Sequence, residues 1–499
     1  MDGFLNNLAT GFGVALSPEN LGFCFVGVLM GTVIGVLPGI GPVATIALLL
    51  PVTFSLDPAS ALIMLAGIYY GAQYGGSAAA ILLKIPGEAG SVVTALDGHP
   101  LALQGRAGEA LAIAAIGSFI AGTIGTLLIA VAAPPLAKVA QAFGPAEYAS
   151  LILFGLVLAV SMASGSRTRA VAMAALGVAL GLAGTDVFSG AQRFTFGIPE
   201  LADGFGFAPL AMGLFGLAEM AYALDRKRRG ERVGGDVRRA SLTRRALDKA
   251  MPAILRGTGV GAILGVLPGG GAILSSLASY ALEKRVSRTP EAFGHGAMEG
   301  VAGPESANNA GAQTSFIPMM TLGVPTNAVM ALMIGAMMIQ GIQPGPLVLD
   351  TRPELFWGMV ASMWIGNLLL LVINLPLIGI WVRLLDVKPR YLFPAVALFM
   401  AIGAYAIENS WFDVVLTGFF GVLGYVLLKL RFELSTLVLG FVLGPMLEEN
   451  FRRALIIAKG DMATFVERPL SLSFIVLGIA VLALPVIFRM MRQRAPIQS

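Results

Sequence analysis

Gly35-Val36-Leu37-Pro38-Gly39-Ile40-Gly41 is a glycine- and proline-rich stretch in the middle of a long apolar run. A related stretch, Gly265-Val266-Leu267-Pro268-Gly269-Gly270-Gly271, follows 230 residues later (265 − 35 = 230). Neither residues 20–56 nor residues 257–282 contain Asp, Glu, Lys or Arg. Because proline removes a backbone donor and glycine favours turns, neither stretch continues a regular helix. Each run is therefore predicted to form a helical hairpin that turns at the Pro-Gly stretch.

The composition indicates an all-α integral membrane protein with several spans. Of the 499 residues, 56% are hydrophobic and 12% are charged, and the mean hydropathy is +0.81. Soluble domains carry about 25% charged residues. Uncharged stretches long enough for a span of roughly 20 residues recur along the chain.

Charge and cysteine usage exclude several classes of function. The net charge is +4, but the basic residues gather in short loops between apolar runs, so no nucleic-acid partner is expected. One cysteine, Cys24, excludes an intrachain disulfide and a cysteine-based metal cluster. His99 and His295 stand alone and are predicted to lie in loops or at the surface. The N-terminus lacks a basic region, and we expect no cleaved signal peptide.

Further breaks are predicted where long uncharged runs meet glycine and proline. Residues 306–349 carry no charge over 44 positions. A straight helix of that length would measure about 66 Å, against about 30 Å of hydrocarbon. We place the break at Gly323-Val324-Pro325-Thr326-Asn327. Helices are predicted to begin at Ser17-Pro18 and at Asp57-Pro58, with the second ending near Lys84 and followed by a polar segment to Arg106.

The chain is predicted to consist of two inverted-topology repeats with re-entrant or broken helical hairpins, plus one extra C-terminal span. Ten Lys and Arg residues lie between 225 and 249, so this loop is expected to be cytoplasmic. Counting spans outward places the N-terminus in the periplasm and the C-terminus in the cytoplasm. Lys138, Arg193, Arg352, Arg452, Arg453 and Lys459 are the exceptions to the positive-inside rule. The predicted units are the first repeat at 1–224, the basic linker at 225–250, the second repeat at 251–465, and the extra helix with its cytoplasmic tail at 466–499.

Broken backbone within a membrane survives only where it is buried in protein or lines a polar cavity, so a substrate or ion site is predicted at the breaks. Free N–H groups at helix starts suit a carboxylate, and free carbonyls with small polar side chains suit a cation such as Na⁺. The predicted substrate-binding residues are Pro38, Gly39, Gly41, Gly87, Ser91, Pro268, Gly269, Gly271, Thr326 and Asn327. The predicted ion-binding residues are Gln73, Ser77, Glu305, Ser306, Asn308, Asn309, Gln313 and Thr314.

Simpler explanations stand beside these predictions. A single Ser or Thr in a span more often satisfies freed backbone or packs against a neighbouring helix. Glu88 is interpreted as an acid at the membrane interface that precedes a helix start. For Glu305, an interfacial position and a functional role explain the residue equally well. The methionines of the second half, Met330, Met333, Met337 and Met338, read as packing residues.

With these motifs the sequence resembles the large membrane subunit of the tripartite tricarboxylate transporters, the TctA family. The matching stretches are Gly35–Pro42, Tyr70–Gly105, Gly213–Glu219, Gly265–Gly271 and Pro304–Pro346, so the resemblance covers both halves. It implies a secondary transporter of the bacterial inner membrane for a tri- or dicarboxylate, driven by Na⁺ or H⁺. It also implies two partners, a small four-span membrane subunit and a periplasmic solute-binding protein.

Similarity to other hairpin-containing transporters suggests an elevator-like movement of the hairpins against a scaffold. No cofactor is expected beyond Na⁺ as a coupling ion. A higher-order oligomer is compatible with the sequence, which does not set the number of copies.

Two other classes of function remain open. An anion channel or pore subunit would also use broken helices, but its flux would not couple to an ion gradient. An intramembrane enzyme would need a buried nucleophile with its base, or a metal cluster, and the chain has one Cys and two isolated His. The sequence therefore favours a non-enzymatic transporter subunit.

Overall fold

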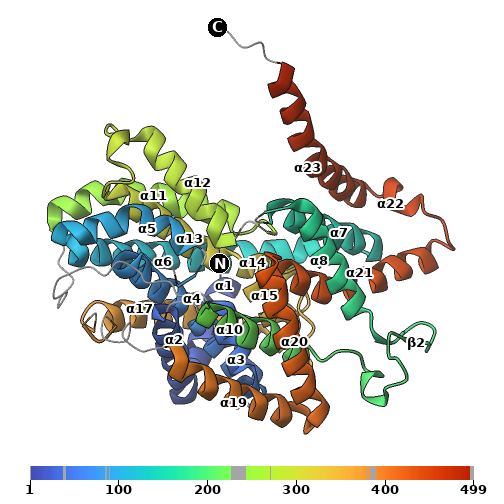
Figure 1. Ribbon diagram of the computed structural model, residues 1–499. Coiled ribbons are helices and arrows are strands. Elements are labelled where there is room, and N and C mark those ends of the chain that lie inside the picture. The colour runs from blue at the N-terminus through green and yellow to red at the C-terminus, as the bar shows by residue number, and fades with distance from the viewer. Residues whose placement is uncertain are drawn as a thin grey trace.

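The computed structural model describes residues 2–37, 41–84, 87–88, 90–163, 165–225, 243–269, 271–377, 379–381 and 389–494. This part of the chain is largely helical, as the all-α fold class predicted (Figure 1). Its only sheet is a short antiparallel pair, β1 (Gly184–Thr185) and β2 (Gln192–Arg193).

The first half of the chain forms a series of helices with short connections. In order they are α1 (Asp2–Ala15), α2 (Pro18–Val36), α3 (Pro42–Phe54), α4 (Pro58–Leu83), α5 (Ser91–Leu101), the π-helical η1 (Ala102–Arg106), α6 (Ala107–Ala140), α7 (Pro145–Met162), α8 (Arg167–Gly181), η2 (Pro199–Leu201), α9 (Phe207–Ala211), the π-helical η3 (Met212–Leu217) and α10 (Ala218–Asp225).

The second half continues in the same way. It contains α11 (Arg244–Leu264), α12 (Gly271–Val286), η4 (Pro290–Ala292), α13 (Glu299–Thr314), α14 (Phe316–Leu322), α15 (Ala328–Ile339), α16 (Val348–Thr351), α17 (Pro353–Asn374), α19 (Pro389–Glu408), α20 (Trp411–Lys429), α21 (Leu434–Ile457), α22 (Thr464–Glu467) and α23 (Pro469–Arg494). Most of the predicted linker 225–250 lies outside the described residues, and α11 already begins at Arg244.

Local sequence signals place the helix ends. Ser17 accepts a hydrogen bond from the N–H of Asn20, and Asp57 accepts one from the N–H of Ala59, so both predicted N-caps are confirmed. The predicted break in the long uncharged run is also confirmed, because α14 ends at Gly323 with φ +68°. Only glycine adopts that left-handed conformation without steric cost.

Three glycines set the spacing of the first pair of long helices. A methyl group added at Gly27, Gly31 or Gly35 of α2 would lie 2.3–2.5 Å from a main-chain carbonyl oxygen of α4. The three oxygens belong, in the same order, to Met64, Ile68 and Ala72. Because the residue numbers of the contacting positions increase in the same order along both helices, α2 and α4 run in the same direction in close backbone contact.

The second half repeats this contact. Methyl groups added at Gly257, Gly261 and Gly265 of α11 would lie 2.2–2.4 Å from the carbonyl oxygens of Gly303, Ala307 and Gly311 of α13. Each glycine follows its counterpart by 230 residues (257 − 27 = 230), and each contact residue follows its own by 239 (303 − 64 = 239). Helices α11 and α13 therefore also run in the same direction.

The parallel pairs define the direction of the helices between them. Gly27, in the middle of α2, contacts Met64, which lies six residues after the start of α4 (64 − 58 = 6), so the start of α4 is level with the first turns of α2. The chain must therefore return from the end of α2 to the start of α4, and α3 carries it back. Helix α12 does the same between α11 and α13. The two predicted hairpins are thus α2–α3 and α11–α12.

The segment from Lys84 to Arg106 is not a simple polar connection. Its central part forms α5, which packs on α4 and α13. Asp97 is fully buried and accepts hydrogen bonds from the Tyr280 hydroxyl and from the N–H groups of Gly294, Gly296 and Ala297, so a residue of the first half anchors a loop of the second.

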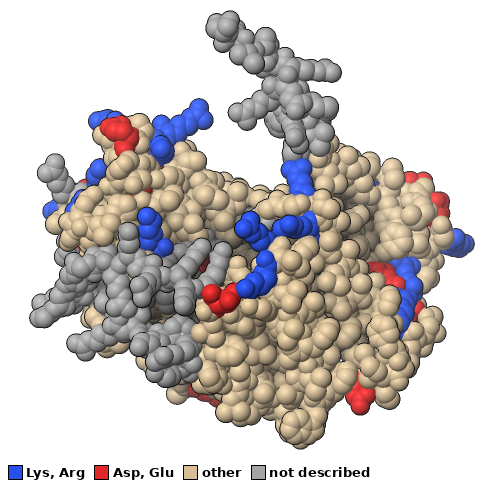
Figure 2. All heavy atoms as spheres, viewed as in Figure 1, with Lys and Arg blue, Asp and Glu red and all other residues tan. Residues whose placement is uncertain are grey.

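The helices have the lengths and surfaces of a multi-pass membrane protein. Six helices in the described part are long and apolar enough to cross a membrane, namely Pro18–Val36, Ser91–Ala140, Pro145–Met162, Phe207–Asp225, Pro353–Asn374 and Trp411–Lys429. Much of the visible surface carries no charge, and Lys and Arg gather in a few clusters (Figure 2).

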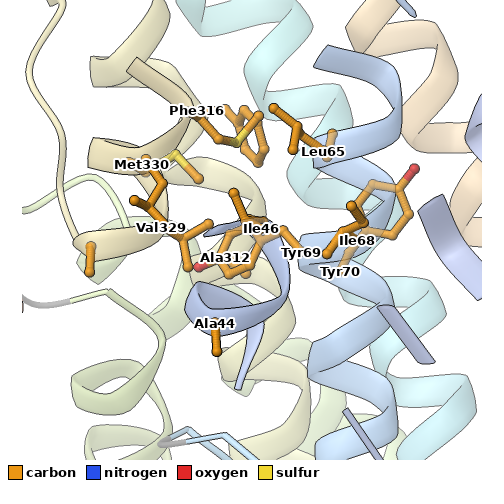
Figure 3. Close-up of a cluster of buried hydrophobic side chains, with 14 of the residues drawn as sticks. Ala44, Ile46, Leu65, Ile68, Tyr69, Tyr70, Ala312, Phe316, Val329 and Met330 are labelled. Carbon is orange, nitrogen blue, oxygen red and sulfur yellow. The ribbon is translucent and has the colours of Figure 1, made fainter. Parts of the chain in front are cut away.

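A cluster of buried hydrophobic side chains joins elements of both halves (Figure 3). Ile46 of α3 and Tyr69 of α4 lie beside Phe316 of α14 and Met330 of α15. The Tyr69 and Phe316 rings lie 6.2 Å apart between centroids. This contact holds the broken segments of the two halves against each other.

The last helix, α23, extends from the body of the molecule beyond α7 (Figure 1). It packs on α7 through a hydrogen bond between Ser150 and Ser471 at 2.6 Å and through the ring of Phe474. The sequence predicts an extra C-terminal span here, and the apolar part of α23 that the structure describes, Pro469–Ala483, is shorter than the six span-length helices.

Candidate functional site

A cavity of about 570 Å³ lies where the broken segments of both halves meet. Gly41 and Pro42 at the start of α3 and Gly87 before α5 line it from the first half. Gly271 at the start of α12 and Asn327, the N-cap of α15, line it from the second. Four helix N-termini therefore converge on one cavity, which brings the two sets of predicted substrate residues together.

Close backbone contacts fix these loops around the cavity. The N–H of Gly269 donates to the carbonyl oxygen of Thr326 at 2.7 Å, and Gly269 has φ +78°. A methyl group added at Gly87 would lie 2.1 Å from the carbonyl oxygen of Gly35. Only glycine permits these approaches, so the glycines are needed for the geometry of the site.

Two of the predicted substrate residues, Pro38 and Gly39, lie outside the described residues. Pro268 is described but is not among the lining residues, although both Gly269 and Gly271 are. Ser91 is buried at the start of α5, where its hydroxyl donates to the carbonyl oxygen of Glu88 at 2.8 Å.

A polar group on the cavity wall connects the two halves. Glu88 lines the cavity and accepts hydrogen bonds from Asn308 Nδ2 and from the N–H of Gly90, both at 2.8 Å. Gln73 also lines the cavity, and its amide group lies 2.9 Å from Glu88 Oε1. Glu88 does stand before a helix start, but it faces the cavity and bonds to α13.

Glu305 lies deeper, at the junction of four helices, and is fully buried. The Ser77 hydroxyl of α4 donates to both of its carboxylate oxygens at 2.7 Å. Thr94 of α5 donates at 2.9 Å, Ser118 of α6 at 3.2 Å and Asn309 of α13 at 3.1 Å. The predicted ion-binding residues Ser77, Glu305 and Asn309 therefore form one cluster.

Other predicted ion-binding residues lie on different faces of α13. A methyl group on Gly117 of α6 would lie 2.7 Å from Ser306 Oγ, and one on Gly125 would lie 2.8 Å from Gln313 Cβ. The Thr314 hydroxyl bonds to the carbonyl oxygen of Ala310 at 3.0 Å. The structure places these three side chains against neighbouring helices, outside the Glu305 cluster.

Several residues of the site were not among the residues predicted from the sequence. Thr94 and Ser118 bond to Glu305 across 211 and 187 residues of chain, and no local pattern marks such partners. Glu219 also lines the cavity. Glu219 is an isolated acid in an apolar run and follows the π-helical segment η3. This sequence pattern could have identified it as a candidate site residue.

The two histidines differ in position. His295 is exposed in the loop before α13, as predicted. His99 is 1% exposed within α5, so its prediction as a loop or surface residue is wrong. Its Nδ1 lies 3.1 Å from the carbonyl oxygen of Ile81, and this contact holds α5 against α4.

Comparison with known proteins gives one family and two relatives. Residues 21–439 match the model of the tripartite tricarboxylate transporter TctA family. An uncharacterized 52.8 kDa protein in the TAR-I ttuC' 3' region of Agrobacterium vitis is 54% identical over 476 residues, which are 95% of this chain and 95% of that protein. A second Agrobacterium vitis protein, from the TAR-II ttuC' 3' region, is 58% identical over 219 residues, or 44% of this chain and 90% of that protein. No solved structure matches the chain.

The family match spans both hairpins and every residue that lines the cavity. The apolar helices and the family together describe a multi-pass membrane component of a transport system. The chain belongs to the tripartite tricarboxylate transporter TctA family.

Proposed function

We propose that this chain is the permease subunit for secondary active uptake of a tri- or dicarboxylate across the bacterial inner membrane. The observation that carries this proposal is the convergence of four helix N-termini on one cavity. Each helix N-terminus acts as roughly half a positive charge, so four provide about two. Together with free N–H groups, this field suits the carboxylates of a small anion.

Coupling to a cation, Na⁺ or H⁺, is supported by the remaining charges of the cavity. Glu88 and Glu219 line it, and its described lining residues include no Lys or Arg. These glutamates oppose an anion that enters alone, whereas an anion that enters with a cation meets balanced charge. The same observation speaks against a simple anion channel, which works best with a net positive lining.

An inverted repeat with an elevator-like movement is part of the proposal. The matched glycine contacts of α2 with α4 and of α11 with α13 support it. The proposed mobile group contains the hairpins α2–α3 and α11–α12 with their partner helices. The scaffold would contain α7, α8, α19, α20 and α21, which lie to the right of and below α11 and α12 in Figure 1.

Membership of a tripartite family supports two partners, a small four-span membrane subunit and a periplasmic solute-binding protein that delivers the carboxylate. We place the N-terminus in the periplasm and the C-terminus in the cytoplasm. Two exceptions to the positive-inside rule fit this orientation, because they are neutralised. Arg193 and Arg452 each pair with both Asp186 and Glu448 at 2.8–3.1 Å.

The test is counterflow in proteoliposomes that contain this chain with its two partner subunits. Vesicles are loaded with unlabelled citrate, succinate or benzoate and then given the same labelled compound. Exchange with at least one compound, and its accumulation only under a Na⁺ or H⁺ gradient, is the expected result. Flux that ignores both gradients would establish a channel instead.

Asn327→Ala, which alters the cavity wall, should lower exchange. Asn450→Ala is the matched control, because the Asn450 amide bonds only to the carbonyl oxygen of Met446 on its own helix and is not among the lining residues. Equal exchange rates in the two variants would show that the substrate does not bind in this cavity.

A further inference from the structure

The Glu305 cluster poses a problem of charge balance. Ser77, Thr94, Ser118 and Asn309 donate hydrogen bonds to its carboxylate, but none of them carries a positive charge. In the part of the chain that the structure describes, no Lys, Arg or His side chain pairs with Glu305. An unpaired charge buried in a membrane domain costs several kcal/mol. Some bound positive charge must therefore accompany Glu305.

Among the residues that the structure describes, no other titratable group around the cluster supplies that charge. Tyr74 of α4 and Glu88 before α5 both lie near enough to Glu305 to interact electrostatically, and neither is a cation. On α12 the nearest carboxylate is Glu283, which bonds to Arg256 of α11 at 2.6 Å. On α5 the Asp97 carboxylate is already satisfied by Tyr280 and backbone N–H groups.

The spacing of the cluster favours a proton over a metal ion. A cation of the size of Ca²⁺ or Na⁺ holds oxygen ligands about 2.4 Å away, so neighbouring ligands in an octahedron lie about 3.4 Å apart. The hydroxyl groups of Ser77 and Thr94 instead lie 2.7–2.9 Å from the carboxylate oxygens, in direct hydrogen bonds.

Asn309 also opposes a metal ion at this position. Its Nδ2 donates to Ser118 Oγ at 2.7 Å, to the main-chain oxygen of Glu305 at 3.0 Å and to Oε1 at 3.1 Å. Three acceptors fix the amide with its N–H groups toward the carboxylate. A metal ion bound to Oε1 would face these donors instead of an oxygen ligand.

The cluster can hold Glu305 with or without a proton. Ser77 Oγ lies 2.7 Å from both carboxylate oxygens and 3.1 Å from the carbonyl oxygen of Gln73. When Glu305 is ionised, the Ser77 hydrogen points to the carboxylate. When Glu305 is protonated, the carboxyl O–H donates to Ser77, whose own hydrogen turns to Gln73. One hydroxyl rotation therefore keeps every group bonded in both states.

We propose that Glu305 carries the coupling ion and that this ion is a proton. The proposal rests on the proposed function and names its cation. A proton from water on the periplasmic side binds the Glu305 carboxylate and forms an O–H bond. The neutral cluster then closes around the carboxyl group, and the bond breaks as the proton passes to water on the cytoplasmic side.

The first test needs no substrate, and its probe is the proton itself. Infrared difference spectra of the purified protein at neutral and alkaline pH should show the carbonyl band of a buried protonated carboxylic acid. Glu305→Gln should remove this band, and Glu354→Gln, at an exposed position in α17, should leave it unchanged. Added NaCl should not alter the band.

A wild-type protein without the band, a band retained in Glu305→Gln, or a band displaced by Na⁺ would each overturn the proposal. Should Glu305→Gln fail to fold, Ser77→Ala takes its place. This variant removes the acceptor of the carboxyl proton and should shift the position of the band. An unshifted band would count against the proposal.

The second test separates this proposal from the proposed function. Glu305→Gln proteoliposomes should lose accumulation driven by a pH gradient at least tenfold, whereas Glu354→Gln proteoliposomes should keep both counterflow and accumulation. Absence of counterflow in the wild type would refute the proposed function and leave the infrared result standing. Wild-type accumulation driven by a Na⁺ gradient alone at clamped pH would show that the coupling ion is not a proton. It would leave the proposed function as a secondary transporter unaffected.

Discussion

Glycine determines how closely the central helices of this protein approach, because each of six glycines faces a main-chain carbonyl of the neighbouring helix. Membrane helices associate mainly through such close packing, since lipid and apolar side chains are equally hydrophobic. The smallest side chain is therefore required at these positions, and the effect of each glycine can be tested alone.

Gly31→Ala should destabilise the protein by about 1–3 kcal/mol, the usual cost of overpacking. The added methyl group would lie 2.3 Å from the carbonyl oxygen of Ile68, and a backbone atom cannot rotate away. Thermal unfolding in detergent measures the change.

Gly22→Ala is the matched control for that substitution. It lies on the same helix, and nothing stands within 4 Å of its added methyl group. The control should keep or raise stability, because alanine favours helix over glycine. Equal losses in the two variants would show that close packing is not the cause.

Asp186, in the loop between β1 and β2, provides a prediction about pH. Hydrogen bonds from Ser189 and Arg452, together with the charge of Arg193, hold the pKa of its carboxyl group well below the usual range. A lowered pKa in the folded state means that the stabilisation is present above the unfolded value of about 3.9 and is lost as the pH falls through the folded value.

Asp186→Asn should therefore speed hydrogen exchange in residues 184–205 at pH 7. The difference from wild type should shrink as the pH falls below about 4. Asp203→Asn, an exposed carboxylate that follows η2 in the same 184–205 segment, should have little effect at either pH. A difference that persists unchanged at low pH would mean that the charge of Asp186 is not responsible.

At the scale of elements, the two hairpins and the two broken segments after them form the cavity. Helix α3 of the first hairpin packs on α19, where Pro51 lies against Gly403. If the hairpins move against a scaffold, this contact must break during transport.

A disulfide between Pro51→Cys and Gly403→Cys should stop transport. A Cβ atom at Gly403 would lie 2.9 Å from that of Pro51, and a small outward shift reaches the spacing of about 3.8 Å that a disulfide needs. The pair is made in a Cys24→Ala background, and uptake of the exchanged carboxylate is measured after oxidation and after reduction. Full uptake by the crosslinked protein would exclude movement between α3 and α19.

At the scale of the whole molecule, the orientation in the membrane follows from where unpaired basic residues lie. Arg193 and Arg452 are neutralised by Asp186 and Glu448, so they weigh less in the charge balance than the linker between α10 and α11. We therefore expect the N-terminus outside and the linker and C-terminus inside.

Single cysteines at Asn6, Gly234 and Ser499, each in the Cys24→Ala background, check this orientation. A membrane-impermeant maleimide should label Asn6→Cys in intact spheroplasts. It should label Gly234→Cys and Ser499→Cys only after permeabilisation. The opposite pattern would invert the proposed topology and reverse the direction of transport.

The sequence by itself determined the features that depend on neighbouring residues. Helix starts at Ser17 and Asp57 follow from capping side chains next to proline, and the break at Gly323 follows from a conformation that favours glycine. The all-α class follows from apolar runs whose backbone must bond within itself in lipid. The family also follows from the sequence, because its motifs are contiguous stretches.

Only the tertiary structure decided which of the polar residues act together. Ser77 and Glu305 are 228 residues apart in the chain, and Asn308 reaches Glu88 across 220. Ser306 and Gln313 share the helix of Glu305 but lie beside Gly117 and Gly125 of α6, outside the group that bonds to its carboxylate, because a helix turns about 100° per residue and distributes neighbours over different faces. Local patterns reveal which residues are polar and where the backbone breaks. The packing of parallel helices on glycine then selects those that share a cavity or a buried cluster.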